Sequence, residues 1–80
     1  MSHTSKIIIL ARKHVGNGAA MESSARLCLE DAVKLQDAGN AGSTSDLAYA
    51  RERAIKSLGY SVGIMHEDYK TAVRLHEASR

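Results

Sequence analysis

No phenylalanine, tryptophan or proline occurs among the 80 residues, and the only large aromatic side chains are three tyrosines. The core must therefore be built from alanine, leucine, isoleucine, valine and methionine, a set that packs as thin, closely spaced helices. A chain of this length buries little apolar surface on its own. One cysteine cannot form an internal disulfide, so we expect self-association to supply the missing burial.

Apolar residues recur at spacings of three and four along most of the sequence, which predicts helices. We expect these helices at 5–14, 20–38, 45–65 and 67–78. The fold class is then all-α, with an antiparallel helical hairpin of two longer helices and a short flanking helix at each end. Neither a linker nor a repeat divides residues 1–80, so we expect a single helical domain that is oligomeric.

Two glycines four residues apart, Gly59 and Gly63, fall inside the predicted third helix. Each costs a helix interior roughly 1 kcal/mol relative to alanine. Small residues at this spacing let two helix backbones approach closely, and Ala48 and Ile55 lie on the same sector. The crossing is either internal, against the first or last helix, or between two copies of the chain.

A helical wheel of the third helix separates a core face from a polar stripe. The expected core face consists of Leu47, Ala50, Ala54, Leu58, Ser61 and Met65. On the stripe, Arg53 and Ser57 are one turn apart and offer a guanidinium fork and a hydroxyl, a combination that suits phosphate. Lys56 adds a charge, and Tyr49 and Tyr60 can stack on a base. An ordinary solvated face is the alternative interpretation.

Catalytic and metal centres find little support in the sequence. The candidate metal ligands are His3, His14, Cys28, His66 and His76, and no two of them have the spacing of neighbours on one helix face. Cys28 belongs to the expected core face of the second helix, where it acts as a small hydrophobe. Glu67 and Asp68 suit the negative first turn of the last helix. We expect a non-enzymatic protein with no metal and no cofactor.

The charge distribution is uneven, although the formal net charge is only +2. Arg12 belongs to a first segment that has no acidic residue. This basic segment either binds a phosphate or an acidic partner, or only balances the charge of acidic neighbours. Arg26 on the second helix is a further cation. The net charge argues against double-stranded nucleic acid as a partner. The apolar run at 7–10 is too short to span a membrane, and a lone thiol suits the cytoplasm.

In size, helix order and the Arg-x-x-x-hydroxyl step at Arg53 and Ser57, the chain resembles the small anti-CBASS sponge proteins of tailed phages. Those proteins form hexamers that sequester cyclic oligonucleotide signals between protomers, and an arginine/threonine step grips phosphate in them. Serine stands in place of the threonine here, and the likeness covers one helix. The resemblance implies a phage protein that evades host defence in the host cytoplasm, with the Gly59/Gly63 face between protomers and several copies of Arg53 around the ligand.

The leading hypothesis is therefore a homo-oligomer that binds a cyclic di- or trinucleotide. Arg53 and Ser57 would hold phosphate, and the supporting groups would be Lys56, Arg26, Arg12, Tyr60 and Tyr49. The alternative is a small protein–protein interaction module, an inhibitor or adaptor without a small-molecule ligand, since exposed tyrosine and arginine are favoured at interfaces.

Overall fold

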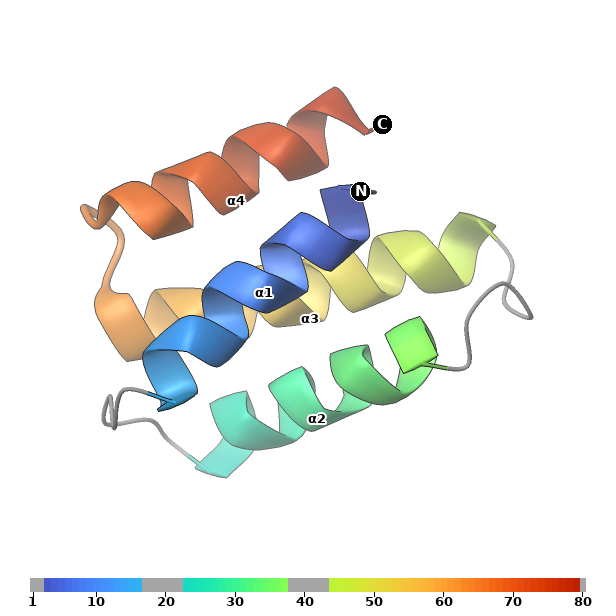
Figure 1. Ribbon diagram of the computed structural model, residues 1–80, viewed down its shortest axis with the longest axis horizontal. Coiled ribbons are helices and arrows are strands. Elements are labelled where there is room, and N and C mark those ends of the chain that lie inside the picture. The colour runs from blue at the N-terminus through green and yellow to red at the C-terminus, as the bar shows by residue number, and fades with distance from the viewer. Residues whose placement is uncertain (1–2, 17–22, 38–43, 80) are drawn as a thin grey trace.

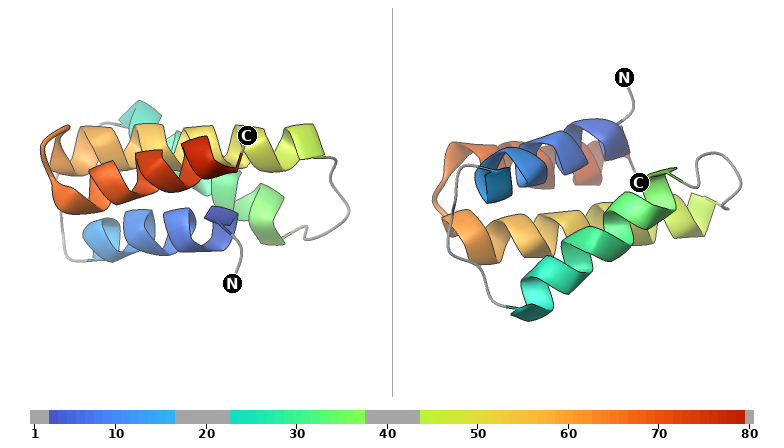
Figure 2. Two further views of the ribbon diagram at one scale, coloured as in Figure 1. Left: turned by 90° about the horizontal axis from the view of Figure 1, so that it is seen from above. Right: turned by 60° about the horizontal axis from the view of Figure 1, so that its bottom comes forward.

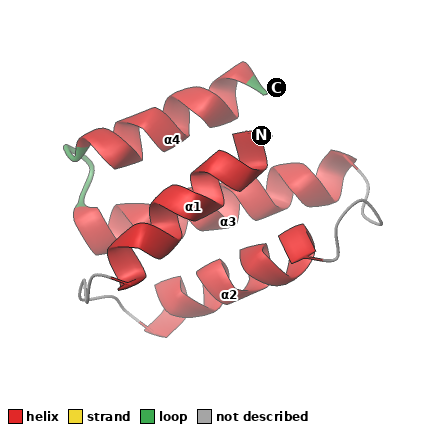
Figure 3. Ribbon diagram, viewed as in Figure 1, coloured by secondary structure: helices red, strands yellow, loops and turns green. Residues whose placement is uncertain are grey.

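A computed structural model describes residues 3–16, 23–37 and 44–79 of the chain. These residues form four helices and no strand (Figure 3). The helices are α1 (His3–Gly16), α2 (Ser23–Asp37), α3 (Thr44–Val62) and α4 (Glu67–Ala78). The all-α class predicted from the sequence is confirmed.

The longest helix, α3, lies at the centre of the bundle. Both α1 and α3 contact every other helix, whereas α2 and α4 do not contact each other and lie on opposite sides (Figure 1). Successive helices run in opposite directions along the long axis, and α2 crosses α3 obliquely (Figure 2). One face of α3 is thus covered by α1, while the gap between α2 and α4 leaves part of α3 accessible.

Alanine dominates the core of the described residues, together with the isoleucine and leucine of the predicted set, whereas no valine or methionine is fully buried there. The buried hydrophobic residues are Ile7, Ile8, Ala11, Ala25, Leu29, Ala32, Ala50, Ala54, Leu58 and Ala72. Small side chains on α3 let its neighbours approach closely, and the aliphatic side chains of Ile7, Ile8 and Leu58 fill the space that remains. Tight packing of this kind depends on the volume of every side chain.

Polar contacts join the helices where apolar contact is thin. The Arg51 guanidinium on α3 donates to the Thr4 hydroxyl on α1 at 3.2 Å and to Nδ1 of His76 on α4 at 3.4 Å. Because Nδ1 of His76 accepts, its Nε2–H faces the Glu52 carboxylate, 3.3 Å away. The start of α1 and the end of α4 are joined by the Ser79 hydroxyl and His3 Nδ1 at 2.7 Å.

The helix boundaries agree with the sequence-based expectation at some ends and differ at others. The last helix has the predicted bounds, and its first turn carries Glu67 and Asp68 as expected. The second lies within its predicted range, whose ends at 20–22 and 38 fall outside the described residues. The third ends at Val62, three residues early, because Gly63 adopts a φ of 83°, a left-handed conformation that terminates helices.

The two glycines therefore have different roles within the chain. A Cβ at Gly59 would lie 2.7 Å from Cε2 of Tyr69, so the absent side chain makes room for the tyrosine ring of α4. No atom lies within 4 Å of the corresponding position at Gly63. Gly59 thus serves an internal crossing of α3 and α4, and the expectation that Gly63 is a mid-helix residue is wrong.

Two other residues of the predicted Gly59/Gly63 sector differ from each other in burial. The last residue of the expected core face is not buried. Ile55 packs partly buried against the core, and Ala48 is half-exposed. Met65 was assigned to the core face but is 77% exposed, because α3 ends before it. Whether any of these residues meets a second copy of the chain stays a prediction.

We expect Gly59→Ala to destabilise the fold although alanine is the better helix former. Overpacking against Tyr69 costs about 1–3 kcal/mol, more than the roughly 1 kcal/mol gained in helix propensity. In a Tyr69→Ala background the same substitution should be stabilising, because the ring is gone. Urea denaturation of the four proteins measures this coupling. Gly16→Ala, at a position with no atom within 4 Å of the added Cβ, is the control, and equal losses in both backgrounds would contradict the crossing.

Candidate functional site

An open groove of about 540 Å³ lies along α3, on the side where α2 and α4 are apart. Its walls come from three helices. The lining residues, which define the α3 groove, are Cys28, Tyr49, Glu52, Arg53, Ile55, Lys56, Tyr69, Val73, His76 and Glu77. A second hollow of about 320 Å³ adjoins it and is lined by Lys56, Gly59, Tyr60, Ile64 and Tyr69.

Arg53 is the most constrained cation of the α3 groove. Its guanidinium lies 4.3 Å from the centroid of the Tyr49 ring, and Nη1 is 3.3 Å from the Asp31 carboxylate on α2. Nη1 also approaches the Cys28 sulfur at 3.8 Å. Nε is buried and has no hydrogen-bond partner among the described residues. The guanidinium plane is therefore held against Tyr49 and α2 while 30% of the side chain remains exposed.

The predicted pairing of Arg53 with Ser57 on one accessible surface is wrong for the single chain. Ser57 is fully buried, at 0% exposure. Seven residues separate it from Ala50, so both side chains point in nearly the same direction from a helix of 3.6 residues per turn. Ala50 faces the core, and Ser57 follows it there. The hydroxyl does not line either hollow.

The other predicted ligand residues are divided by the fold. Tyr49 and Lys56 line the α3 groove beside Arg53, whereas Tyr60 lines the adjoining hollow. Arg12 on α1 and Arg26 on α2 are exposed and line neither. The fold thus brings two cations and one predicted tyrosine together and leaves the two more distant arginines outside.

Sequence reasoning missed the contribution of α4 to this surface. Tyr69 and Val73 of α4 are half-buried and line the α3 groove. Glu52 and Glu77 add two carboxylates, so the groove is not uniformly positive. The spacing of Tyr69, Val73, His76 and Glu77 on one helix face was a signal of a shared surface, but only the packing of α4 against α3 shows where that surface lies.

Histidines distant in sequence also meet in the fold. The rings of His14 and His66 are 4.7 Å apart between centroids, and Nε2 of His14 lies 2.6 Å from an oxygen of Asp68. The search for helical spacing within the sequence could not detect this group, because its members come from α1, from the turn after α3 and from α4.

None of the helices in the described ranges is both long and apolar enough to cross a membrane.

Cys28 offers a direct test of the groove. It was expected on the buried face of α2, but it is half-buried and lines the α3 groove. We expect a small thiol reagent to label it completely in the native protein, although more slowly than a free peptide thiol, because the Arg53 guanidinium lies against its sulfur. Mass spectrometry without denaturant measures the extent, with Cys28→Ser as the control. Labelling that begins only on unfolding would mean that the groove is closed.

Comparison of the chain with protein-family models, with curated proteins and with solved structures finds no match.

Proposed function

We propose that this protein is a non-enzymatic binding protein that sequesters a cyclic oligonucleotide in the α3 groove of an oligomer. The observation that supports this most is Arg53, whose guanidinium is stacked on Tyr49 beside Lys56 in an open hollow. A volume of about 540 Å³ is within the usual range of small-molecule pockets. Cations next to aromatic rings suit ligands that combine phosphates with bases.

In this proposal the two sides of the groove bind different parts of the ligand. Arg53 donates to phosphate on the α2 side, with Lys56 as a second positive charge. Tyr49 and Tyr69 provide ring faces for a base. Glu52 and Glu77 repel phosphate but accept hydrogen bonds from the amino groups of a base. The phosphate then lies towards α2 and the base towards α4.

Asp31 is the competitor of the phosphate for Arg53. Its side chain is 51% exposed, and ion pairs in such positions contribute little stability because water screens them. Each phosphodiester of the ligand carries one negative charge, as the carboxylate does, and its two free oxygens can accept two bonds from the guanidinium fork, where Asp31 accepts from Nη1 alone. Exchange of one partner for the other costs little, so Arg53 can leave Asp31 when the phosphate binds.

Exposed apolar side chains support the assembly of several copies that this proposal requires. Tyr60, Ile64 and Met65 are 52%, 71% and 77% exposed at the end of α3 and in the turn after it. Exposed apolar groups of this size mark interaction surfaces. We assign them to contacts between copies, which would cover the open groove and enclose its ligand.

The same three residues favour one alternative function, a protein–protein interaction module that acts as an inhibitor or adaptor. Tyrosine and other large apolar side chains are enriched in interface cores. In that case a target protein would cover Tyr60, Ile64 and Met65, and the α3 groove would need no small ligand.

Titration calorimetry with cyclic di- and trinucleotides tests the ligand. Arg53→Ala should weaken binding roughly 10- to 100-fold, since a hydrogen bond to a charged group contributes about 1.5–3 kcal/mol. Arg26→Ala, which removes an exposed arginine outside the groove, should have little effect. Asp31→Asn should strengthen binding up to about fivefold by releasing Arg53, whereas the matched control Asp37→Asn should not.

The outcome separates the two functions. Chromatography of the recovered ligand should show it unchanged. No heat with any of these nucleotides would reject the sequestration proposal and favour the interaction module. Binding that is equally sensitive to Arg26→Ala and Arg53→Ala would place the ligand outside the α3 groove.

Light scattering at micromolar concentration tests the assembly. We expect a mass above that of one 8.6 kDa chain, and we expect Ile64→Glu to reduce it to the monomer, because a buried charge opposes association. Ile9→Glu is the matched control, since Ile9 is 50% exposed on a different helix. A monomeric mass for the unaltered protein would contradict the proposed oligomer.

A further inference from the structure

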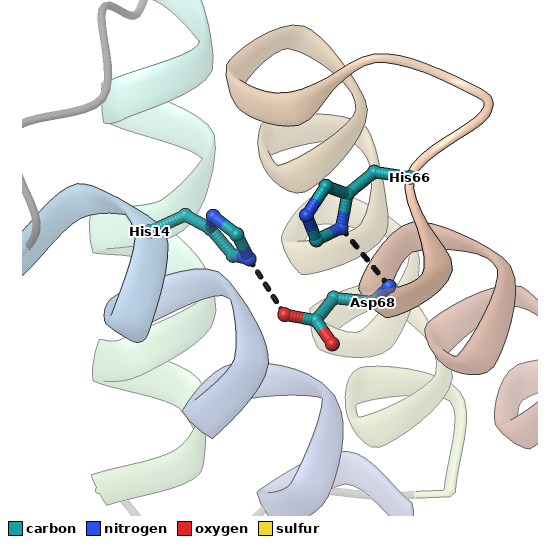
Figure 4. Close-up of side chains that lie close together, drawn as sticks. All are labelled: His14, His66 and Asp68. Carbon is teal, nitrogen blue, oxygen red and sulfur yellow. Dashed lines mark hydrogen bonds and ion pairs between the residues drawn. The ribbon is translucent and has the colours of Figure 1, made fainter.

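Three potential metal ligands from separate segments converge at the end of the bundle opposite the start of α1 and the end of α4 (Figure 1, Figure 4). His14 comes from the last turns of α1, His66 from the turn that precedes α4, and Asp68 from the first turn of α4. One donor atom from each lies within 4.8 Å of the others. The side chains of His14 and Asp68 are 15% and 22% exposed, so two of the three donors are largely fixed by packing.

We propose that His14, His66 and Asp68 bind a divalent transition metal, and specifically Zn²⁺. Two imidazoles and one carboxylate are a donor set that suits this ion, whereas Mg²⁺ and Ca²⁺ prefer oxygen ligands. Three protein ligands leave a fourth position for water or for a group from another molecule. The site is separate from the α3 groove and does not depend on the function proposed for it.

Little movement is needed to close the site. Ligand atoms bound to one Zn²⁺ at about 2.0–2.1 Å lie about 3.3 Å apart in a tetrahedron. Nε2 of His14 and Oδ2 of Asp68 are already 2.6 Å apart and need to separate slightly. The ring of His66 lies edge-on to that of His14, at 84°. Because His66 is exposed, its ring is able to rotate towards the other two ligands.

The hydrogen bonds of the metal-free protein determine which ring protons of His14 and His66 must move when the metal binds. His14 donates from Nε2 to Asp68, and Nδ1 of His66 accepts from the Asp68 backbone N–H at 3.1 Å (Figure 4). Coordination through Nε2 requires each neutral imidazole to carry its proton on Nδ1 instead. The proton is relocated rather than released, and His66 gives up its bond to the helix terminus. Protonated histidines would have to lose a proton, so zinc binding should weaken in acid.

The charges near the site are mixed. The hydrogen bond from His14 lowers the pKa of Asp68, so the carboxylate is ionised before a metal binds. Lys13 lies 3.7 Å from the same oxygen and opposes a cation, but its side chain is 60% exposed and free to move into water. The positive end of the α4 dipole also opposes the metal. Binding therefore depends on coordination bonds rather than on the local field.

A metal here would join α1 to the turn that links α3 and α4. Ile64 and Met65 directly precede His66 in that turn and are strongly exposed. Coordination of His66 would fix their position at the surface. A ligand bound only to the folded protein also raises the free energy of unfolding, by an amount that grows with the logarithm of the free ligand concentration once that exceeds the dissociation constant.

Metal content and thermal stability test the site. After incubation with Zn²⁺ and gel filtration, we expect one zinc per chain and a melting temperature that rises with added Zn²⁺ but not with Mg²⁺ or Ca²⁺. His66→Ala removes an exposed ligand without disturbing the core and should abolish both effects. His14→Ala should do the same, judged by the zinc-dependent rise rather than by the absolute melting temperature. His3→Ala and Cys28→Ser, which remove other potential ligands, should retain both effects.

Spectroscopy identifies the donors directly. With Co²⁺ we expect visible absorption bands of a tetrahedral site without the near-ultraviolet band of a thiolate ligand. Histidine side-chain NMR should show Nε2 of His14 and His66 coordinated and Nδ1 protonated. The proposal is overturned if no zinc is retained, if His66→Ala binds zinc as well as the unaltered protein, or if Cys28→Ser loses it.

Discussion

The packing of the bundle depends on how closely the other helices approach α3. Ala50 and Ala54 are fully buried on its core face, whereas Gly59 lies on another side of the helix, against the ring of Tyr69. Because these positions carry almost no side chain, α1 and α4 contact α3 near its backbone. Any larger residue would separate the helices and open voids around Leu58, the largest inward side chain of α3.

Close approach has a cost, since alanine buries little apolar area when it packs. Hydrogen bonds between side chains of different helices therefore help to hold the helices in place. Arg51 joins α1 to α4 through Thr4 and His76, and His14 reaches Asp68 near the other end of the same two helices. These polar bonds also involve residues of the candidate site, because Glu52 and His76 both line the α3 groove and are hydrogen-bonded to each other.

Local rules predicted the helices well and the surfaces only in part. The bounds of α4 followed from acidic residues at its start and apolar spacing along it. Helical spacing also placed Ala50, Ala54 and Leu58 in the core. The assignment of Ser57 to the polar stripe was wrong because seven residues, about two turns, bring its side chain back close to the direction of Ala50, into the core. The assignment of Met65 to the core face failed because the φ of Gly63 is a backbone property that ends the helix.

Contacts between distant segments could not be derived from one sequence. The pairing of Arg53 with Asp31 needs the packing of α2 against α3, and the meeting of His14 with His66 and Asp68 needs that of α1 against α4. Histidine spacing along the chain carries no information about either. The glycine at 59 was recognised as a close crossing, but Tyr69 as the side chain that fills it required the fold.

Because α2 and α4 lie apart, the helices on the two sides of the bundle are packed to different extents and differ in local stability. The most extensive helix pair is α2 with α3, whereas α4 buries one hydrophobic residue completely, Ala72. A short turn with a left-handed glycine connects α4 to the rest. Cooperative units of low local stability open before the whole domain unfolds. Since α4 has the character of such a unit, we expect its amide hydrogens, in one wall of the α3 groove, to exchange together and before those of α1, α2 and α3.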